Sequence, residues 1–428
     1  MIIKLTILLL FFVVMVAVGI YARRHAGSVD GFVLGGRSVG PWLTAFAYGT
    51  SYFSAVVFVG YAGQFGWKYG LASTWIGIGN AVIGSLLAWV ILGGYMATAI
   101  NDFIQGIIML AGILAVIAAV LAGQGGFMEA VGKMAQIPSD VEVTMGQPGA
   151  FTSFFGPDPL NLLGVVILTS LGTWGLPQMI HKFYTIRDEK SIQTGTIIST
   201  VFAIIVSGGC YFLGGFGRLF DSPEIYGTDG SVVYDSIIPF MLSGLPDILV
   251  GIVVILVLSA SMSTLSSLVL TSSSTLTLDF LKDTVMKKMS ERGQIIVMQL
   301  LIVFFIILSV VLALDPPAFI AQLMGISWGA LAGAFLAPFL YGLYWKRTTR
   351  MSVWASFAAG IGITVSNMLI GYIDSPINAG ALAMGAGMII VPVVSLLTPK
   401  PSGEHIDRIF ACYDETVVIK KKHSLEEE

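Results

Sequence analysis

The chain has 428 residues, of which 56% are hydrophobic and 11% are charged, with a formal net charge of −3 and a mean hydropathy of +0.87. Soluble domains carry roughly 25% charged residues because their surfaces face water, so this composition excludes a water-soluble globular protein. The two cysteines, Cys210 and Cys412, lie far apart and predict neither a disulfide framework nor a metal cluster.

Apolar runs of about 20 residues recur along the chain, each long enough to cross about 30 Å of hydrocarbon. We expect the first run to be retained rather than cleaved as a signal peptide, because Arg23 and Arg24 follow it and no small-residue cleavage site does. The pattern predicts eleven membrane-spanning helices, at 2–22, 40–62, 71–94, 99–123, 158–181, 191–217, 248–278, 294–314, 318–345, 351–373 and 377–398.

The charges predict how these spans are oriented. With the N-terminus outside, the outer segments keep only Lys4, Lys68, Lys133 and Arg218 of the 22 Lys and Arg residues, which is the asymmetry expected of an inner-membrane protein. Two long polar loops, at 124–157 and 218–247, then lie outside. We therefore expect a transmembrane domain over 1–398 and a cytoplasmic tail over 399–428.

Ionisable side chains are rare inside the spans, and Asp102, near the inner end of its span, is the main candidate. Without an HExxH motif, an intramembrane zinc protease has no ligands, and a proton-coupled carrier has no obvious mid-membrane relay. A carrier of this composition must coordinate its driving ion through neutral oxygens. That chemistry suits sodium and predicts no organic cofactor.

The span at 248–278 supplies such oxygens. It contains the run SASMSTLSSLVLTSSSTLT, and one helical face of that run carries mainly hydroxyl side chains. The residues of this face are Ala260, Ser263, Thr264, Ser267, Thr271 and Ser274. The alternative is that small residues serve helix packing while the hydroxyls bond to their own helix.

Two other spans are predicted to be interrupted, and interrupted spans are a pointer to a transporter's binding site. Three helix-breaking residues, the expected hinge, lie in 158–181: Gly172, Gly175 and Pro177. Small and hydroxyl residues weaken the centre of 40–62: Gly49, Thr50, Ser51 and Ser54. The alternative is that Gly and Pro are commoner in membrane helices generally.

Five segments, in order along the chain, resemble the sodium:solute symporter family. They read DGFVLGGRSVGPWLTA, AYGTSYFSAVVFVGYAGQFGWKYG, NDFIQGIIMLAG, GTWGLPQMIHKFYTIRD and ASMSTLSSLVLTSSSTLTLDF. The resemblance implies an all-α inverted-repeat fold of the leucine-transporter type with one extra N-terminal helix.

The same resemblance implies a sodium site between the first and eighth core helices. The hydroxyls of Ser263 and Thr264 would be ligands, together with the backbone carbonyls of Ala260, Thr50 and Phe53. An all-oxygen shell suits a small hard cation, by analogy with other hard-cation sites.

For other residues carried over from the resemblance, a purely structural role is an alternative to a role in transport. Asp102 would assist sodium release at the inner mouth, or would instead stabilise a helix N-terminus. Thr169, Thr173 and Trp174 would face the substrate, although Trp174 also suits plain core packing.

One segment departs from the family. The run LLAWVILGGYMATAINDF joins the span at 71–94 almost directly to the helix beginning at Asn101, as if the third and fourth core helices had been removed. The missing pair would normally pack against the span at 248–278 and the one after it.

The predicted function is sodium-driven uptake of a small organic solute, such as proline, another amino acid or pantothenate, and not an enzymatic reaction. The expected partners are sodium, the solute and the lipid bilayer, with no nucleic acid. For a solute carboxylate we expect helix N-termini and hydroxyls to be used, because direct cationic partners are expected at the inner face alone. The alternatives are a shortened non-transporting relative, acting as a membrane sensor or a degenerate carrier, and a proton-driven or nucleobase carrier of similar architecture.

Overall fold

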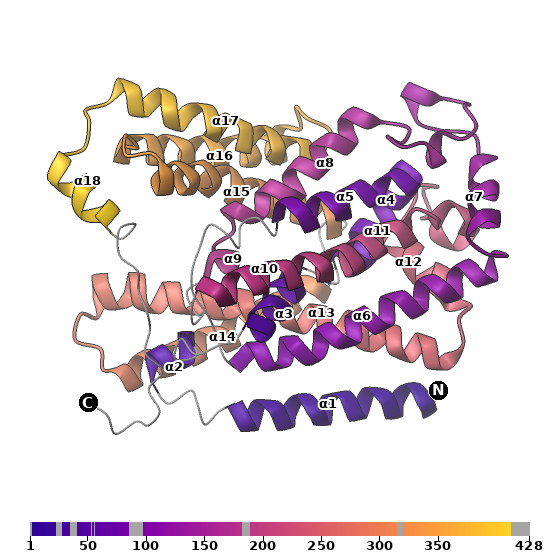
Figure 1. The fold of residues 1–428 in the computed structure, drawn as a ribbon, viewed down its shortest axis with the longest axis horizontal. Coiled ribbons are helices and arrows are strands. Elements are labelled where there is room, and N and C mark those ends of the chain that lie inside the picture. The colour runs from indigo at the N-terminus through magenta and orange to yellow at the C-terminus, as the bar shows by residue number, and fades with distance from the viewer. Residues whose placement is uncertain are drawn as a thin grey trace.

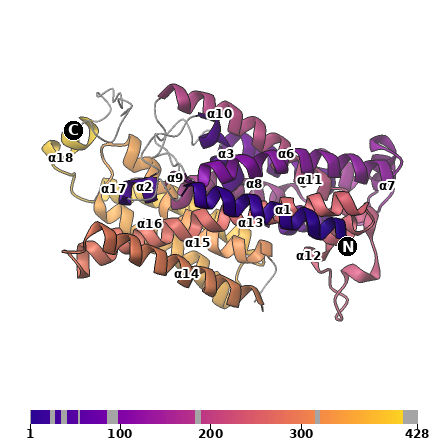
Figure 2. The same ribbon diagram turned by 90° about the horizontal axis from the view of Figure 1, so that it is seen from below.

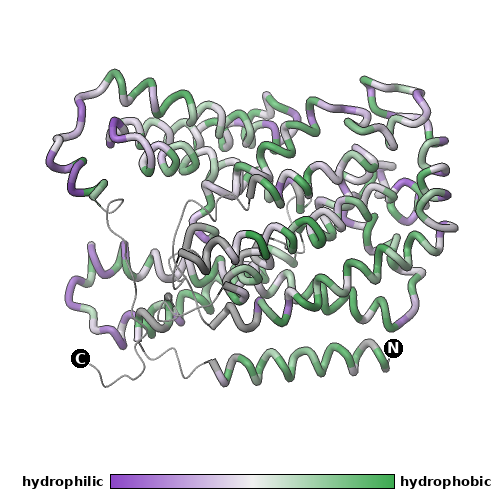
Figure 3. Tube along the Cα trace, in the orientation of Figure 1, coloured by the Kyte–Doolittle hydropathy of each residue, from purple (hydrophilic) through white to green (hydrophobic). Residues whose placement is uncertain are grey.

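The computed structural model describes residues 2–22, 28–34, 41–52, 54, 56–84, 97–181, 189–314 and 320–411. Within these residues the structure is helical apart from loops and one isolated bridge between Tyr226 and Val232. The long helices run side by side in one bundle (Figure 1). In Figure 3 their middle parts are hydrophobic, and hydrophilic residues gather toward the two ends. This is the distribution expected of a protein that crosses a membrane.

The predicted spans coincide with observed helices wherever the structure describes them. By length and composition, seven described helices can cross a membrane, and two shorter apolar ones, at Leu5–Val18 and Pro159–Gly175, accompany them. One of the seven, α13 (Asp247–Ser274) continued by the π-helix η14 (Thr275–Val285), is 39 residues long. The other uninterrupted helices are α1 (Ile2–Ala22), α6 (Ala97–Gly123), α14 (Glu291–Leu314), α15 (Ile320–Tyr344), α16 (Arg350–Ile370) and α17 (Pro376–Leu397).

Both predicted interruptions are confirmed. In the first, α3 (Pro41–Tyr52) ends before the non-helical Ser54, and the chain resumes as a π-helix (Val56–Tyr61) and then α4 (Ala62–Tyr69). In the second, α8 (Pro159–Leu171) passes into a 3₁₀ turn (Gly172–Gly175), and an extended Leu176 separates this turn from α9 (Pro177–His181). Each interrupted span therefore exposes backbone groups in the middle of the bundle.

Two further spans also change helical type. The span at 71–94 begins as a 3₁₀ turn (Gly70–Ser73), followed by α5 (Thr74–Gly79) and a π-helix (Asn80–Gly84), and its remainder lies outside the described residues. The span at 191–217 consists of α10 (Glu189–Ala203), a π-helix (Ile204–Gly208) and α11 (Gly209–Gly214).

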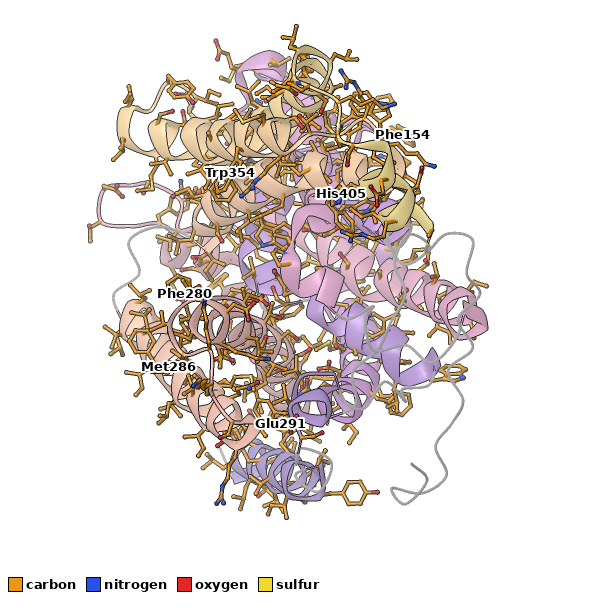
Figure 4. The ribbon with its side chains drawn as sticks, turned by 90° about the vertical axis from the view of Figure 1, so that its left-hand side faces the viewer. Phe154, Phe280, Met286, Glu291, Trp354 and His405 are labelled. Atoms are coloured by element: carbon orange, nitrogen blue, oxygen red, sulfur yellow. The ribbon has the colours of Figure 1, made fainter. Side chains whose placement is uncertain are left out.

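The described connections lie at the two ends of the bundle (Figure 1). The start of α1 lies at the right-hand end of Figure 1, with α7 (Phe127–Ala135) and α12 (Tyr234–Ser243) from the two long loops. The turn between η14 and α14 lies at the left-hand end, with α18 (Gly403–Phe410). Figure 4 looks onto that left-hand end, where Met286, Glu291 and His405 are seen.

The core lies where the interrupted spans meet, and it is built from large aromatic side chains. Phe58 and Phe65 are fully buried against Tyr211 and Phe216 of the neighbouring span. Helices α4 and α11 approach so closely that a Cβ on Gly66 would collide with the Gly214 backbone. Small residues are therefore required at this crossing.

Helix α14 lies at the edge of the bundle (Figure 2). Only 6% of its apolar window is buried, against 22% or more in the other long helices. Leu300, Val303 and Leu312 are each more than half exposed. This helix follows the span against which the two missing family helices would normally pack.

Candidate functional site

Three helices bring hydroxyl and carboxylate oxygens together inside the bundle: Thr50 on α3, Asp102 on α6 and Ser263 on α13. All three residues are at most 1% exposed. The Ser263 Oγ lies 2.6 Å from Asp102 Oδ1 and 3.1 Å from Thr50 Oγ1. Residues far apart in the sequence thus form one buried group, which we call the oxygen cluster.

The hydroxyls of the oxygen cluster also bond within the bundle. The Thr50 hydroxyl donates to the Phe46 carbonyl at 2.7 Å. The Ser263 hydroxyl, with its single proton, lies within hydrogen-bonding distance of both Asp102 and Thr50. Hydroxyl and carboxylate oxygens gathered in this way are ligands that suit a small hard cation.

Thr264, next along α13, adds a further oxygen. Its Oγ1 is buried and makes no hydrogen bond in the described part of the chain. Because a buried hydroxyl without a partner is costly, its position requires an explanation. Ala260, fully buried one turn earlier on the same helix, lies on the face predicted from the sequence. The donor set of hydroxyls and carbonyls therefore fits sodium.

The broken span contributes backbone oxygens beside the cluster. Thr50 lies two residues before the end of α3, so its carbonyl is among the last four, which an α-helix leaves without an intrahelical partner. The predicted carbonyl ligand from Phe53 lies outside the described residues. Of the predicted set, the structure thus brings together Thr50, Ser263 and Asp102, with Ala260 and Thr264 on the same helix as Ser263.

The three residues expected to face the substrate lie at the end of α8 and in the turn after it. Thr169 and Thr173 are buried, and their hydroxyls donate to the carbonyls of Val165 and Ser170, both at 2.8 Å. Trp174 is partly buried and packs against the core. Both hydroxyl protons are therefore used in local bonds to the backbone of this span.

A cavity of about 710 Å³ opens beside this region. Helices α4 and α8 line it, with the turn before α17 and the two long loops. Along α8 the cavity reaches Asn161 and Val165, and Val165 lies one turn before Thr169. We call it the outer vestibule, after the orientation that the charges predict.

Two residues of the outer vestibule, Gln64 and Lys68, were not predicted as site residues. They lie one turn apart on α4, and both line the vestibule. The sequence identifies Lys68 as one of the few Lys and Arg residues predicted to lie outside. Its burial beside a cavity cannot be predicted in this way, because it depends on how α4 packs. The Lys68 ammonium lies over the Tyr234 ring, 5.4 Å from its centroid. Burial raises the pKa of the Tyr234 phenol, so this ring stays neutral.

A comparison with protein-family models matches the sodium:solute symporter family. The match comprises two stretches, residues 32–92 and residues 80–360. The two stretches meet at 80–92, where the sequence predicts that two helices are missing.

Curated relatives extend this comparison. The chain is 22% identical to the osmoregulated proline transporter OpuE of Bacillus subtilis over 508 aligned positions, covering 96% of this chain and 98% of the relative. It is 28% identical to the sodium/pantothenate symporter of Haemophilus influenzae, covering 75% of this chain and 64% of that protein. The alignment to OpuE is longer than this chain, so OpuE contains positions that the chain lacks.

A solved structure agrees on the fold. A sodium-coupled sialic acid symporter in its substrate-bound outward-open state superposes with a TM-score of 0.66 at 15% identity, covering 94% of this chain and 99% of that one. The predicted inverted-repeat fold is thereby confirmed.

Proposed function

The chain belongs to the sodium:solute symporter family, and from this premise we propose that the oxygen cluster binds the sodium ion that drives transport. Sodium-coupled symport of a solute across a membrane is the function of the family and of this chain. The chain is therefore a transporter, with sodium and a small solute as its cargo.

The observation that carries the proposal is the group of buried oxygens that three helices bring together, with the unpartnered Thr264 hydroxyl beside it. Ser263 and Thr50 face each other at 3.1 Å, and the buried Thr264 hydroxyl has no described partner. A sodium ion coordinated by these oxygens would give the Thr264 hydroxyl the partner that it lacks among the described residues. Asp102, 2.6 Å from Ser263, would supply the negative charge that balances the ion.

A sodium ion in this position would link the interrupted span to the continuous helix that packs beside it. The cluster joins α3, which belongs to an interrupted span, to the continuous helix α13. Bound sodium would hold α3 against α13, and its departure would release that contact. A ligand that favours one arrangement over another in this way shifts the population between the two. Asp102 lies within the cluster, so it would assist release by exchanging sodium for its hydrogen bond with Ser263.

For the solute we propose a small organic molecule such as proline, another amino acid or pantothenate; proline and pantothenate are named for two relatives. Thr169, Thr173 and Trp174 would face it where α8 breaks. The break itself supports a hinge role for Gly172, Gly175 and Pro177, because the short 3₁₀ turn and the extended Leu176 already separate α8 from α9.

We further propose that the protein lies in the inner membrane with its N-terminus outside and residues 399–428 in the cytoplasm. The separation of the long loops from α18 at opposite ends of the bundle supports this orientation (Figure 1).

The test is uptake by proteoliposomes of labelled proline, pantothenate and other solutes, with an inward sodium gradient present or replaced by potassium. We expect uptake that requires sodium and is lost in the Ser263→Ala, Thr264→Ala double variant. Uptake that is independent of sodium, or unchanged in the double variant, would overturn the assignment of the cluster.

A second candidate function, a non-transporting relative, is favoured by two observations. The family match divides at 80–92, and only 6% of the apolar window of α14 is buried. A version with two family helices restored at that point separates the candidates. Transport by the restored version, with none by the natural chain, would establish the second candidate.

A further inference from the structure

The outer vestibule contains two cationic side chains, and one of them is fully engaged. Arg218 forms an ion pair with Asp140 at 2.7 Å, and its Nε donates to the Trp67 carbonyl at 2.6 Å. Its guanidinium also lies over the rings of Trp67 and Phe151, 4.7 and 4.0 Å from their centroids. Arg218 therefore fastens the outer loops to α4 and has little capacity left for a ligand.

Lys68, the second cation, is not engaged in this way. Among the described residues no carboxylate forms an ion pair with it, and its contact is with the face of the Tyr234 ring. Asp158 is the nearby acidic group, but its oxygens accept hydrogen bonds from the backbone and side chain of Asn161 at the start of α8. The Lys68 ammonium is thus a half-buried cation beside a cavity, with donors available for an anionic group.

Gln64 lies one turn deeper on the same face of α4, about 6 Å along the helix axis. It is 4% exposed, and its Oε1 atom is buried without a hydrogen-bond partner in the described structure. This oxygen lacks a donor, whereas Lys68 lacks an acceptor. A ligand that carries both groups would satisfy both residues.

We propose that Lys68 and Gln64 select solutes as they enter: Lys68 pairs with a carboxylate, and Gln64 accepts a hydrogen bond from an N–H group of the same solute. The ligand class is a small amino or imino acid. Asp374, exposed in the turn before α17, adds a negative charge to the vestibule wall and disfavours a simple anion. The inference rests on the proposed function, because it gives the substrate class of the same transport path.

Binding to purified protein in detergent and uptake by proteoliposomes should be measured in parallel. The ligand pairs are proline with prolinamide, which lacks the carboxylate, and proline with tetrahydrofuran-2-carboxylate, in which an ether oxygen replaces the N–H group. Lys68→Gln should weaken proline binding about tenfold or more, raise KM to match, and leave prolinamide unaffected. Lys68→Arg should keep most of the affinity. Gln64→Leu should weaken the binding of proline more than that of tetrahydrofuran-2-carboxylate.

The control is Lys133→Gln, which removes an exposed outer cation paired with Glu129 and should change neither ligand. Equal weakening of proline and prolinamide in Lys68→Gln would overturn the inference, as would proline binding that does not depend on Lys68 or no binding of proline at all. Binding that depends on Lys68 without sodium-driven uptake would leave the inference standing while the proposed function fails. Sodium-driven uptake without selection for the carboxylate would do the reverse.

Discussion

Replacing Thr264 by valine removes one buried hydroxyl but keeps the shape of the side chain. The change should raise the stability of the sodium-free protein and weaken the protection that sodium gives. The Thr264 Oγ1 atom has no hydrogen-bond partner among the described residues. A buried polar group left in that state costs about 1–3 kcal/mol. The sodium-free Thr264→Val protein should therefore gain stability, by up to about that amount.

The stabilisation that sodium adds should be smaller in the variant than in the natural protein. At a sodium concentration of about 100 times Kd, a single site stabilises the folded protein by about 2.7 kcal/mol. If losing one ligand raises Kd about tenfold, the same concentration gives only about 1.4 kcal/mol. Thermal unfolding in detergent, in sodium or in potassium at equal ionic strength, measures both changes.

A matched control is Thr364→Val on α16, where a buried threonine donates to the Gly360 carbonyl at 3.0 Å. That variant should lose about 0.5–1.5 kcal/mol and keep its full response to sodium. The reasoning would be refuted if Thr264→Val kept the sodium protection of the natural protein. It would also be refuted if the variant lost as much sodium-free stability as Thr364→Val.

Three further predictions concern the cluster and its surroundings. Ser263→Ala should raise the sodium concentration for half-maximal uptake roughly tenfold or more, because it removes a proposed sodium ligand that also bonds to Asp102. Ser261→Ala is the control: the Ser261 hydroxyl bonds to its own helix, so the sodium titration of uptake should not change. Asp102→Asn keeps an acceptor for Ser263 but loses the charge, so sodium protection against unfolding should fall while the protein stays folded, and unaltered protection would contradict the role given to the carboxylate. Gly66→Ala places a methyl group against the Gly214 backbone and should cost about 1–3 kcal/mol or more, seen as a lower Tm; a wild-type Tm would show that α4 and α11 can separate.

The sequence predicts the spans well because hydrophobic length and the distribution of Lys and Arg are local properties. It also locates the break in 158–181, since Gly172, Gly175 and Pro177 weaken a helix by themselves. The hydroxyl face of α13 follows from helical periodicity. That Asp102 lies 2.6 Å from Ser263 does not follow, because this contact depends on how α6 packs against α13. Gln64 and Lys68 could not be predicted as site residues for the same reason, because they line a cavity that several segments distant in the sequence enclose.

The length of α13 has an electrical consequence. Ser263 lies about 24 Å along the axis from Asp247 at 1.5 Å per residue, which is most of the way across about 30 Å of hydrocarbon. In the proposed orientation, a sodium ion that arrives from outside must cross most of the membrane field to reach it. One charge moved through 100 mV is worth about 2.3 kcal/mol. Sodium affinity from the outside should therefore rise with an inside-negative voltage, so that the membrane potential itself helps to load the carrier.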